Sequence, residues 1–388
     1  MTVKSLGARD HRIDFIRGLA LLTIFINHVP GNVLEPFTHK NFGLTDSAEL
    51  FVVLAGIAAA FAYFPRFSEG HRLLASLKAV KRAGTLYVAH VASIVAGIAV
   101  FAWAAVHFGR TDLLDTLNIA PVMADPVRGL VGLAAMTHQI GYHNILPMYV
   151  LLLLALPLMM LLASRGLAPL LGVSAIVYAL TQIYGWSPPA YPAAGHWFFN
   201  PFAWQLLFVT GFFVGVRLMQ KRPPVPYVRP LWWLALAYLV AGCVFHRWNL
   251  YGSMPDLPLP DRFYANEKPF VAIGRLLHIL SLLYVVGHSG LMDLVRRLPA
   301  SNPLTVAGRH ALPVFWTGTL LCMVGQTVMA VYAPTAGVQL PLLALAIAIQ
   351  AGLAYGLDWM ASAEKAARAG KAAGRAEPGL AAGVPAAA

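Results

Sequence analysis

Charged residues are scarce in this sequence. Only 11% of the 388 residues are Asp, Glu, Lys or Arg, whereas 59% are hydrophobic and the mean hydropathy is +0.66. Soluble globular domains carry about 25% charged residues, so a soluble fold of this length would lack the polar surface to cover itself. The composition therefore predicts an integral membrane protein. The net charge of +12 does not indicate nucleic-acid binding, because the basic residues are spread between apolar segments.

Cysteine is also scarce, which excludes a disulfide framework and a thiolate metal site. The two cysteines, Cys243 and Cys322, both lie in apolar stretches and are expected to be inert core residues. The 13 histidines show no metal-ligand spacing of the HExxH or Cys/His type. There is no P-loop and no glycine-rich dinucleotide fingerprint. We therefore expect no metal and no permanently bound cofactor.

Ten apolar segments have roughly the 20 residues that a helix needs to cross a bilayer. The sequence therefore predicts an all-α polytopic membrane protein, with one membrane-embedded domain over residues 1–360 and a low-complexity, disordered cytoplasmic tail over 361–388. Asp14 and Arg17 interrupt the first segment and no cleavage site follows it, so a retained helix is expected rather than a signal peptide. The segments lie at about 13–29, 47–65, 84–108, 143–163, 167–185, 201–219, 231–248, 270–290, 311–333 and 337–359.

The distribution of basic residues orients these ten segments. An even number of spans places both termini on one side of the membrane. If that side is the cytoplasm, 20 of the 28 Lys and Arg residues fall in inner segments, six in outer segments, and Arg17 and Arg275 within spans. Such an excess is what the positive-inside rule requires. Both termini are therefore predicted to be cytoplasmic.

The first segment, RGLALLTIFINH, carries Arg17 at one end and His28 at the other. Eleven residues make about three helical turns, so the two side chains lie on nearly the same face, about 16 Å apart along the axis. Asp14, one turn before Arg17, can pair with it. Ionisable residues inside spans usually mark a functional site. For either residue alone, snorkelling of Arg17 or a structural hydrogen bond of His28 is the alternative.

The second segment places two acids, Asp46 and Glu49, near its outer end, at a depth comparable to His28. A carboxylate beside an imidazole fixes its tautomer and raises its basicity, which is the arrangement that general-base catalysis uses. The alternative is that both acids cap the helix N-terminus, where negative charge is favoured. Gly56 and the small residues after it permit close packing against another helix.

The segment IDFIRGLALLTIFINH resembles the first-helix signature of the acyltransferase 3 superfamily, through Asp14, Arg17, Gly18 and His28. The segment ELFVVLAG is similar to that superfamily's second-helix motif, with Ala55 where a Ser is common. The resemblance is closer to the OpgC family, which succinylates osmoregulated periplasmic glucans, and it covers most of residues 12 to 325. The segments that carry it, in order, are NHVPGN, NFGLTDSAELFVVLAG, HNILPMYVLLL, FNPFAWQLLFVTGF, RLLHIL and GRHALPVF.

This resemblance implies a bacterial inner-membrane O-acyltransferase that moves a succinyl group from cytoplasmic succinyl-CoA to hydroxyls of a periplasmic glucan. Arg17 would lie near the entry of the donor's anionic portion. His28 would deprotonate the acceptor hydroxyl, and Glu49 would orient His28 or receive charge. The implied partners are acyl-CoA, a glucan and the lipid bilayer.

Six further residues are candidates for substrate binding. Arg275 and His278 form an i, i+3 pair inside a span; Arg275 would read the distal carboxylate of a succinyl donor, or it would form an ion pair with Asp46 or Glu49. Each of the other two pairs also has a purely structural alternative. Arg309 and His310 would bind coenzyme A phosphates or anchor a helix at the inner interface, and His143 and Asn144 would line an acceptor site or cap a helix.

Alternative functions remain open at this stage. An O-acetyltransferase acting on another envelope polysaccharide would share these motifs and differ in the acyl pocket. A proton-coupled transporter or exporter would also use buried Arg, His and Glu, although the sequence shows no internal repeat of the kind common in transporters. A non-catalytic assembly protein with the same scaffold is disfavoured by the intact Arg17, His28 and Glu49.

Overall fold

The computed structural model describes residues 10–192, 194–253, 260–264, 266–332 and 334–375. Within these residues the regular structure is helical, apart from one isolated bridge between Pro189 and His196. The helices, with short 3-10 turns labelled η, are α1 (His11–Asn27), η1 (Glu35–Phe37), η2 (His39–Phe42), α2 (Ser47–Ser68), α3 (Arg72–Phe108), α4 (Asp112–Thr116), α5 (Ala120–Ala124), α6 (Pro126–Ala134), η3 (Gly141–His143), α7 (Ile145–Arg165), α8 (Leu167–Tyr184), α9 (Pro201–Met219), α10 (Arg229–Arg247), η4 (Leu250–Ser253), α11 (Asp261–Tyr264), α12 (Ile273–His288), α13 (Leu291–Arg297), α14 (Pro303–Arg309), α15 (Ala311–Val331) and α16 (Ala336–Arg375).

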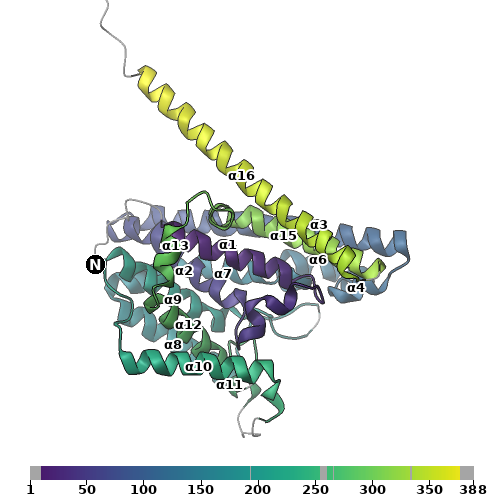
Figure 1. The fold of residues 1–388 in the computed structure, drawn as a ribbon, viewed down its shortest axis with the longest axis horizontal. Helices are drawn as coiled ribbons and strands as arrows, with labels where there is room; N and C mark the ends of the chain where they lie inside the picture. The colour runs from purple at the N-terminus through teal and green to yellow at the C-terminus, as the bar shows by residue number, and fades with distance from the viewer. Residues whose placement is uncertain (1–9, 193, 254–259, 265, 333, 376–388) are drawn as a thin grey trace, which may run out of the picture.

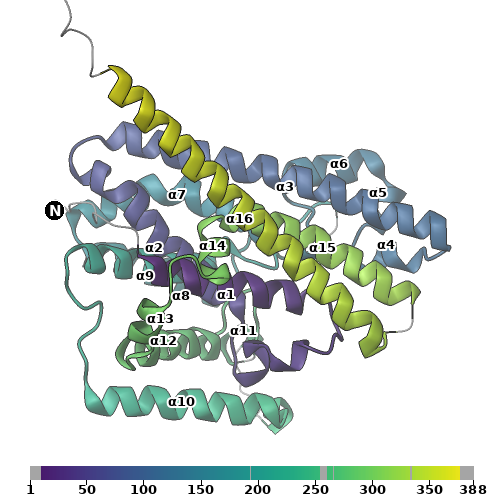
Figure 2. The ribbon, with the colours of Figure 1, turned by 45° about the horizontal axis from the view of Figure 1, so that its top comes forward.

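The long helices lie side by side in one bundle with two ends (Figure 1). Helices α1, α3 and α10 run from the left toward the right in Figure 2, where α15 also ends, close to α4. We call the left-hand end, where α1 begins, the N-terminal end, and the opposite end the distal end. The chain crosses from the distal end back through α2, which is the most enclosed of the long apolar helices. The start of α1 therefore lies toward the N-terminal end and its finish toward the distal end.

Each of the ten predicted segments corresponds to a helix, but the count of ten spans is not confirmed. Seven helices among the described residues are long and apolar enough to cross a membrane, and the pair α12 and α13, bent by 61°, would make eight. Helix α1 has only 17 residues, and α10 is not among the seven. The seven are Ser47–Ser68, Arg72–Phe108, Gly141–Arg165, Leu167–Tyr184, Pro201–Met219, Ala311–Val331 and Ala336–Arg368.

The last helix, α16, continues beyond the predicted end of the membrane domain. It runs to Arg375, so residues 361–375, expected to belong to a disordered tail, are helical. Alanine is the best helix former, and this stretch is rich in it, which explains the difference. Residues 376–388 of the predicted tail lie outside the described residues. In both ribbon views the C-terminal part of α16 projects away from the bundle, whereas its first part lies against it (Figures 1 and 2).

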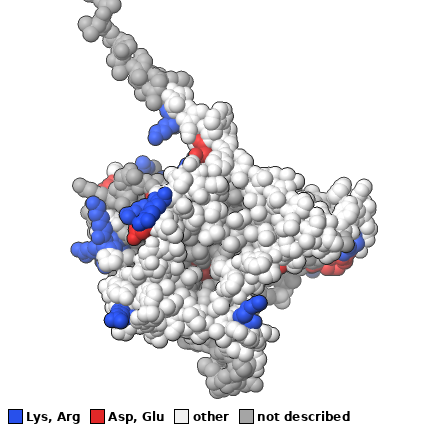
Figure 3. Space-filling model, in the orientation of Figure 1, with Lys and Arg blue, Asp and Glu red and all other residues white. Residues whose placement is uncertain are grey.

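The surface fits a protein surrounded by lipid. Most of the face in Figure 3 carries neither basic nor acidic side chains, and the blue and red groups gather toward its edges, with several basic side chains at the left near the N-terminus. Several large apolar side chains on α3 and α10 are more than half exposed, among them Val106, Val88 and Leu234. Such a surface is tolerated when its solvent is hydrocarbon rather than water.

Three glycines let helices approach at backbone distance. A Cβ added to Gly18 of α1 would lie 1.9 Å from the Leu304 carbonyl oxygen of α14, and one added to Gly308 of α14 would lie 1.8 Å from the Asp14 carbonyl oxygen. The Gly56 contact has the same character, since an added Cβ would lie 2.0 Å from the carbonyl oxygen of Phe208 on α9. The expectation of close packing at Gly56 is therefore confirmed. The α1–α14 contact also fixes the surroundings of Arg17.

Candidate active site

Arg17 is held at the N-terminal end, where α1 meets α14. Its Nη1 lies 3.2 Å from Oδ1 of Asp14, and it donates to the carbonyl oxygen of Gly308 at 3.3 Å. Asp14 is almost fully buried, with 3% of its side chain exposed, whereas Arg17 keeps 13%. The predicted pairing of Asp14 with Arg17 is confirmed. The guanidinium is thus anchored by a buried carboxylate and remains partly accessible.

Arg309 and His310 follow directly on Gly308, so they lie at the same junction of helices. Arg309 Nη1 donates to both carboxylate oxygens of Asp358 on α16, at 2.8 and 2.9 Å, and His310 Nε2 lies 3.3 Å from Oδ1 of Asp358. Three basic side chains therefore gather near the N-terminal end of α1. Two of them already share one carboxylate, which ties α14 and α15 to α16.

His28 lies at the other end of α1, where it is the C-cap residue. Its ring stacks on the ring of Tyr142, with centroids 4.0 Å apart and planes 20° apart. Its carbonyl oxygen accepts a hydrogen bond of 2.6 Å from Nε2 of Gln326 on α15. Within the described part of the chain, neither ring nitrogen of His28 is hydrogen-bonded. The imidazole is therefore oriented by stacking and by its backbone, while its nitrogens stay available.

A small cavity lies along the face of α1 between these two residues. Its volume is about 10 Å³, roughly the space of one water molecule. Leu21, Ile24 and His28 line it from α1, in the same i, i+4, i+7, i+11 series that starts at Arg17. Gly318, Thr319 and Gln350 are among the residues that line it from α15 and α16. The seam between Arg17 and His28 thus holds a gap no larger than one water molecule.

Glu49 belongs to a buried charge network between α2 and α12. It is fully buried, and its Oε1 accepts from Nε of Arg275 at 2.8 Å and also from Nη2 of the same guanidinium. Arg275 Nη1 donates to Oδ1 of Asn266 at 3.0 Å, and its Nη2 lies 3.8 Å from Asp46. Lys268 donates to Asp46 as well. Two carboxylates and two cations here form a neutral cluster that joins α2 to α12.

Asp46 and Glu49 also cap α2, as the capping alternative predicts. Asp46 Oδ1 accepts from the amide of Ala48 at 2.8 Å, and Oε2 of Glu49 accepts from the amide of Asp46 at 3.0 Å. Burial acts to raise the pKa of Asp46, but the nearby Lys268 and Arg275 cations outweigh it and hold that pKa below its usual range. The carboxylate of Asp46 is therefore ionised at neutral pH.

The expected contact between Glu49 and His28 is absent. Among the described residues, no hydrogen bond or ion pair joins the two, since both oxygens of Glu49 are used by Arg275 and by the amide of Asp46. The physical reason is that Arg275, buried with 6% exposure, requires a carboxylate more strongly than a neutral imidazole does. The expected ion pair of Arg275 to Asp46 or Glu49 is the arrangement observed.

His278 and His39 flank this charge network. Nδ1 of His278 is 2.8 Å from Oγ1 of Thr45, and Nδ1 of His39 is 3.3 Å from Oγ of Ser47. The Nε2 atom of each ring is buried without a partner among the described residues. Burial lowers the pKa of His39, which lies in η2. Both imidazoles are thus neutral groups packed beside the cluster rather than members of its ion pairs.

His143 and Asn144 lie between α3 and α7. His143 is buried, and its Nδ1 lies 3.2 Å from the carbonyl oxygen of Ile140, whereas its Nε2 has no partner in the described part of the chain. Asn144 occupies the N-cap position of α7, but its side chain makes no capping hydrogen bond. The alternative prediction, that the side chain of Asn144 caps this helix, is therefore wrong. His143 directly follows Tyr142, so it lies next to the residue that stacks on His28.

Several residues of this region were missed by sequence reasoning. Tyr142 and Gln326 contact His28, and Asn266 and Lys268 complete the charge network. Gln326 lies in the predicted span 311–333, whereas the other three come from connecting segments with no recognisable local pattern. His90 is different, because it lies fully buried inside the predicted span 84–108. The rule that ionisable residues within spans mark sites could have found it. Neither of its ring nitrogens has a hydrogen-bond partner among the described residues.

The geometry as a whole places an anchored cation and an available imidazole at opposite ends of one helix face. An anion bound near Arg17 and a hydroxyl bound near His28 would approach each other along the seam between α1, α15 and α16. An imidazole with open nitrogens can accept a proton from a hydroxyl group. The arrangement suits a transfer reaction in which the two substrates enter from opposite ends of the bundle.

Comparison with known proteins identifies the family of this chain. Residues 9–362 match the family model described as OpgC protein, OpgC_C. No curated protein and no solved structure matches the chain. The match covers nine-tenths of the sequence and includes α1, the charge network and α16 up to residue 362. The chain therefore belongs to the OpgC family, and this membership implies a membrane-bound acyltransferase that acts on periplasmic glucans.

Proposed function

We propose that this protein transfers a succinyl group from cytoplasmic succinyl-CoA to hydroxyl groups of a periplasmic glucan. The observation that carries the proposal is the placement of Arg17 and His28 at the two ends of one α1 face, with a cavity between them. A donor and an acceptor that occupy opposite sides of a bilayer require such a layout. The family assignment supplies the glucan and the transferase chemistry.

The donor would bind at the N-terminal end. Coenzyme A carries phosphate groups, and Arg17, Arg309 and His310 gather basic groups at the α1–α14–α15 junction. Arg17 suits this role because Asp14 fixes its position while part of the guanidinium remains exposed. An arginine is a strong binder of phosphate oxygens, since its planar donors match their geometry. We further propose that this end faces the cytoplasm, as the excess of basic residues near it requires.

His28 would act as the general base. One ring nitrogen takes the proton of a glucan hydroxyl as its oxygen attacks the thioester carbonyl. The carbon–sulfur bond then breaks, and the leaving thiolate of coenzyme A takes up the proton from the imidazolium. The products are a succinyl ester and free coenzyme A, and His28 returns to its neutral form. Base catalysis of this kind contributes roughly 10²- to 10⁴-fold, and positioning of the two substrates supplies more.

Access for the donor requires the α1 seam to open. Arg17 and His28 are separated by about 16 Å along the helix, whereas the cavity between them is only about 10 Å³. A thioester arm therefore needs α15 and α16 to move away from α1. The side chains along its path are mostly apolar, with Thr319 and Gln350 as polar exceptions. A dry path of this kind protects the thioester from hydrolysis.

Glu49 and Arg275 would act as a positioning pair rather than as groups that touch the reacting atoms. Their ion pair fixes α2 against α12, and α2 in turn packs beside α1. An arginine whose guanidinium is already bound by Glu49 and Asn266 could bind a donor carboxylate only if that pairing rearranged. His278, packed beside Thr45, supports the same wall.

The test is release of free coenzyme A by the purified full-length protein, with succinyl-CoA as donor and a periplasmic-type glucan as acceptor. We expect glucan-dependent release that falls at least 10²-fold in His28→Ala, because the general base is lost. Arg17→Gln should raise the KM for succinyl-CoA. His71→Ala is the matched control, since His71 lies exposed at the start of α3, and it should retain full activity.

The outcomes separate the proposed function from its alternatives. Reaction with acetyl-CoA but not succinyl-CoA would leave the transferase and change the acyl group. If neither thioester reacts with any glucan, and His28→Ala instead changes proton-coupled flux in proteoliposomes, the protein is a transporter and the proposal is wrong. Full activity of a folded His28→Ala protein would remove His28 from the mechanism.

A further inference from the structure

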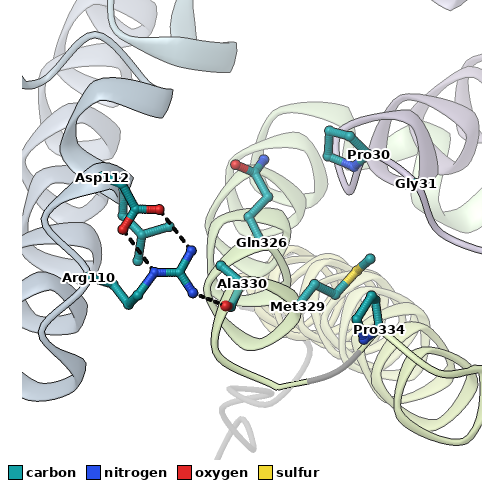
Figure 4. A pocket seen from close by; sticks show the side chains of 9 residues that line it. Pro30, Gly31, Arg110, Asp112, Gln326, Met329, Ala330 and Pro334 are labelled. Atoms are coloured by element: carbon teal, nitrogen blue, oxygen red, sulfur yellow. Dashed lines mark hydrogen bonds and ion pairs between the residues drawn. The ribbon is translucent and has the colours of Figure 1, made fainter.

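The distal end of the bundle carries an open pocket of about 360 Å³ (Figure 4). This volume falls in the range of ligand pockets, roughly 300 to 1,000 Å³. Three separate segments form it, namely the loop after α1 with Pro30 and Gly31, the α3–α4 connection with Arg110 and Asp112, and the end of α15 with Gln326 and Met329. All three lie at the end of the bundle that is opposite to Arg17.

The polar groups of the pocket are fixed and carry no net charge. Arg110 donates from Nε and Nη2 to the two carboxylate oxygens of Asp112, at 2.8 Å each, and from Nη1 to the carbonyl oxygen of Ala330. Figure 4 shows this guanidinium directed at Ala330, with Gln326 one turn earlier on the same helix. A neutral pair of this kind does not favour an anion such as coenzyme A. It offers donors and acceptors side by side, which suits hydroxyl groups, because each hydroxyl both donates and accepts.

The apolar part of the lining complements those groups. Pro30 and Met329 face the pocket with carbon and sulfur atoms (Figure 4). A hexose ring presents one face of C–H groups and a rim of hydroxyls, so an apolar floor with a planar ion pair beside it fits both. Pockets for small ligands generally combine an apolar lining with a few placed polar groups in this way.

The pocket is joined directly to His28. Gln326, which lines it, donates from Nε2 to the carbonyl oxygen of His28 at 2.6 Å. Pro30 and Gly31 are the second and third residues after His28 in the chain. A sugar bound beside Gln326 would therefore lie next to the backbone of the residue that carries the proposed general base.

We propose that this pocket is the acceptor subsite, in which one neutral hexose unit of the glucan binds with its hydroxyls on Arg110, Asp112 and Gln326. The inference rests on the proposed function and names the place where its acceptor binds. Gln326 has a second part in the subsite, because its amide links the sugar-binding surface to the backbone of His28. Occupation of the pocket then holds the acceptor beside the loop that begins at His28.

The experiment measures the KM for glucan and the KM for succinyl-CoA separately, with the purified full-length protein. Arg110→Gln and Asp112→Asn remove charged hydrogen-bonding groups, and Met329→Trp fills the pocket. We expect Arg110→Gln and Asp112→Asn each to raise the KM for glucan about tenfold, since a hydrogen bond to a charged group contributes about that factor. Met329→Trp should raise it as well, because the indole occupies the space of the sugar. The KM for succinyl-CoA should change less than twofold. Equilibrium binding of glucan, measured without donor, should weaken by the same factor.

A matched control is available on the same side of the bundle. Arg128 pairs with Asp125 on α6 at 3.6 Å in an exposed position outside the pocket, so Arg128→Gln should leave both KM values unchanged. If the unmodified protein transfers nothing to any glucan, the proposed function fails. If it transfers, but all three pocket variants keep the glucan KM and the glucan binding of the unmodified protein, the acceptor subsite alone is wrong. An equal rise in both KM values would also overturn the subsite.

Discussion

Replacing Arg275 with methionine would leave a carboxylate buried without its cation. Glu49 is fully buried, and one of its oxygens accepts two hydrogen bonds from the guanidinium of Arg275. Among the described residues, its other oxygen accepts only from the amide of Asp46. Removal of one partner of a buried ion pair costs about 3–5 kcal/mol, since the remaining charge is desolvated and uncompensated. We expect Arg275→Met to lower the free energy of unfolding by about that amount.

The reciprocal change should cost less. In Glu49→Leu the guanidinium of Arg275 keeps its hydrogen bond to Asn266 and lies 3.8 Å from Asp46, so we expect a loss of about 2 kcal/mol, below the roughly 3–5 kcal/mol of a fully uncompensated buried charge. The double variant removes both charges and fills the site with apolar atoms. It should be within about 1 kcal/mol of the unmodified protein, because such replacements are often neutral. The coupling energy is then about 4 kcal/mol or more.

The assay is reversible unfolding of the purified protein in mixed micelles, followed by circular dichroism for all four members of the cycle. A loss below about 1 kcal/mol for Arg275→Met would refute the reasoning, and so would a double variant no more stable than Arg275→Met. The transfer activity of the folded double variant, measured with succinyl-CoA and with acetyl-CoA, tests separately whether Arg275 binds the donor carboxylate. If Arg275 reads the donor carboxylate, activity with succinyl-CoA should fall far more than activity with acetyl-CoA.

Three further predictions concern other parts of the structure. Gly308→Ala places a Cβ 1.8 Å from a backbone oxygen of α1, so α14 must shift and carry the anchor of Arg17 with it; the KM for succinyl-CoA should rise, and an unchanged value would contradict the close packing. His90→Leu should raise the free energy of unfolding by about 1 kcal/mol, since neither ring nitrogen has a partner among the described residues; a lower melting temperature would contradict this. Burial raises the pKa of Asp46, but Lys268 and Arg275 lower it by more, so the pKa in the folded protein is below its usual value. The ionised carboxylate therefore stabilises the fold fully above about pH 4, and this stabilisation is lost as the pH falls through the lowered pKa. The stability difference between the unmodified protein and Asp46→Asn should therefore shrink in acid, and a constant difference from pH 7 to pH 3 would be inconsistent with that shift.

Helices could be predicted from the sequence because their signal is local. A long apolar run within a span satisfies its own backbone hydrogen bonds, so length and hydropathy suffice. The predicted segment 201–219 coincides with α9. The start of α3 was harder, since it begins at Arg72 rather than at residue 84. Its first turns are amphipathic, with Ala75 and Ala79 buried and basic residues on the outside, and a hydropathy criterion excludes such turns.

Contacts between site residues could likewise be predicted where the partners are close in sequence, and not where they are distant. The pairing of Asp14 with Arg17 follows from their i, i+3 spacing on one helix. The partner of Glu49 does not, because Arg275 is 226 residues away, and depth alone made His28 an equally good candidate. Depth in a span limits which residues can meet, but the rotation of each helix decides which ones do.

That distinction bears on how the active site is divided between the two substrates. Arg17 and His28 share a face because of helix geometry alone, so their relation survives any rearrangement that keeps α1 intact. The acceptor pocket depends instead on three segments brought together at the distal end, tied by Arg110 to Ala330 and by Gln326 to His28. A change of acceptor sugar therefore requires changes only in these connecting segments. The path of the donor along α1 would remain the same, since it is built into the periodicity of one helix.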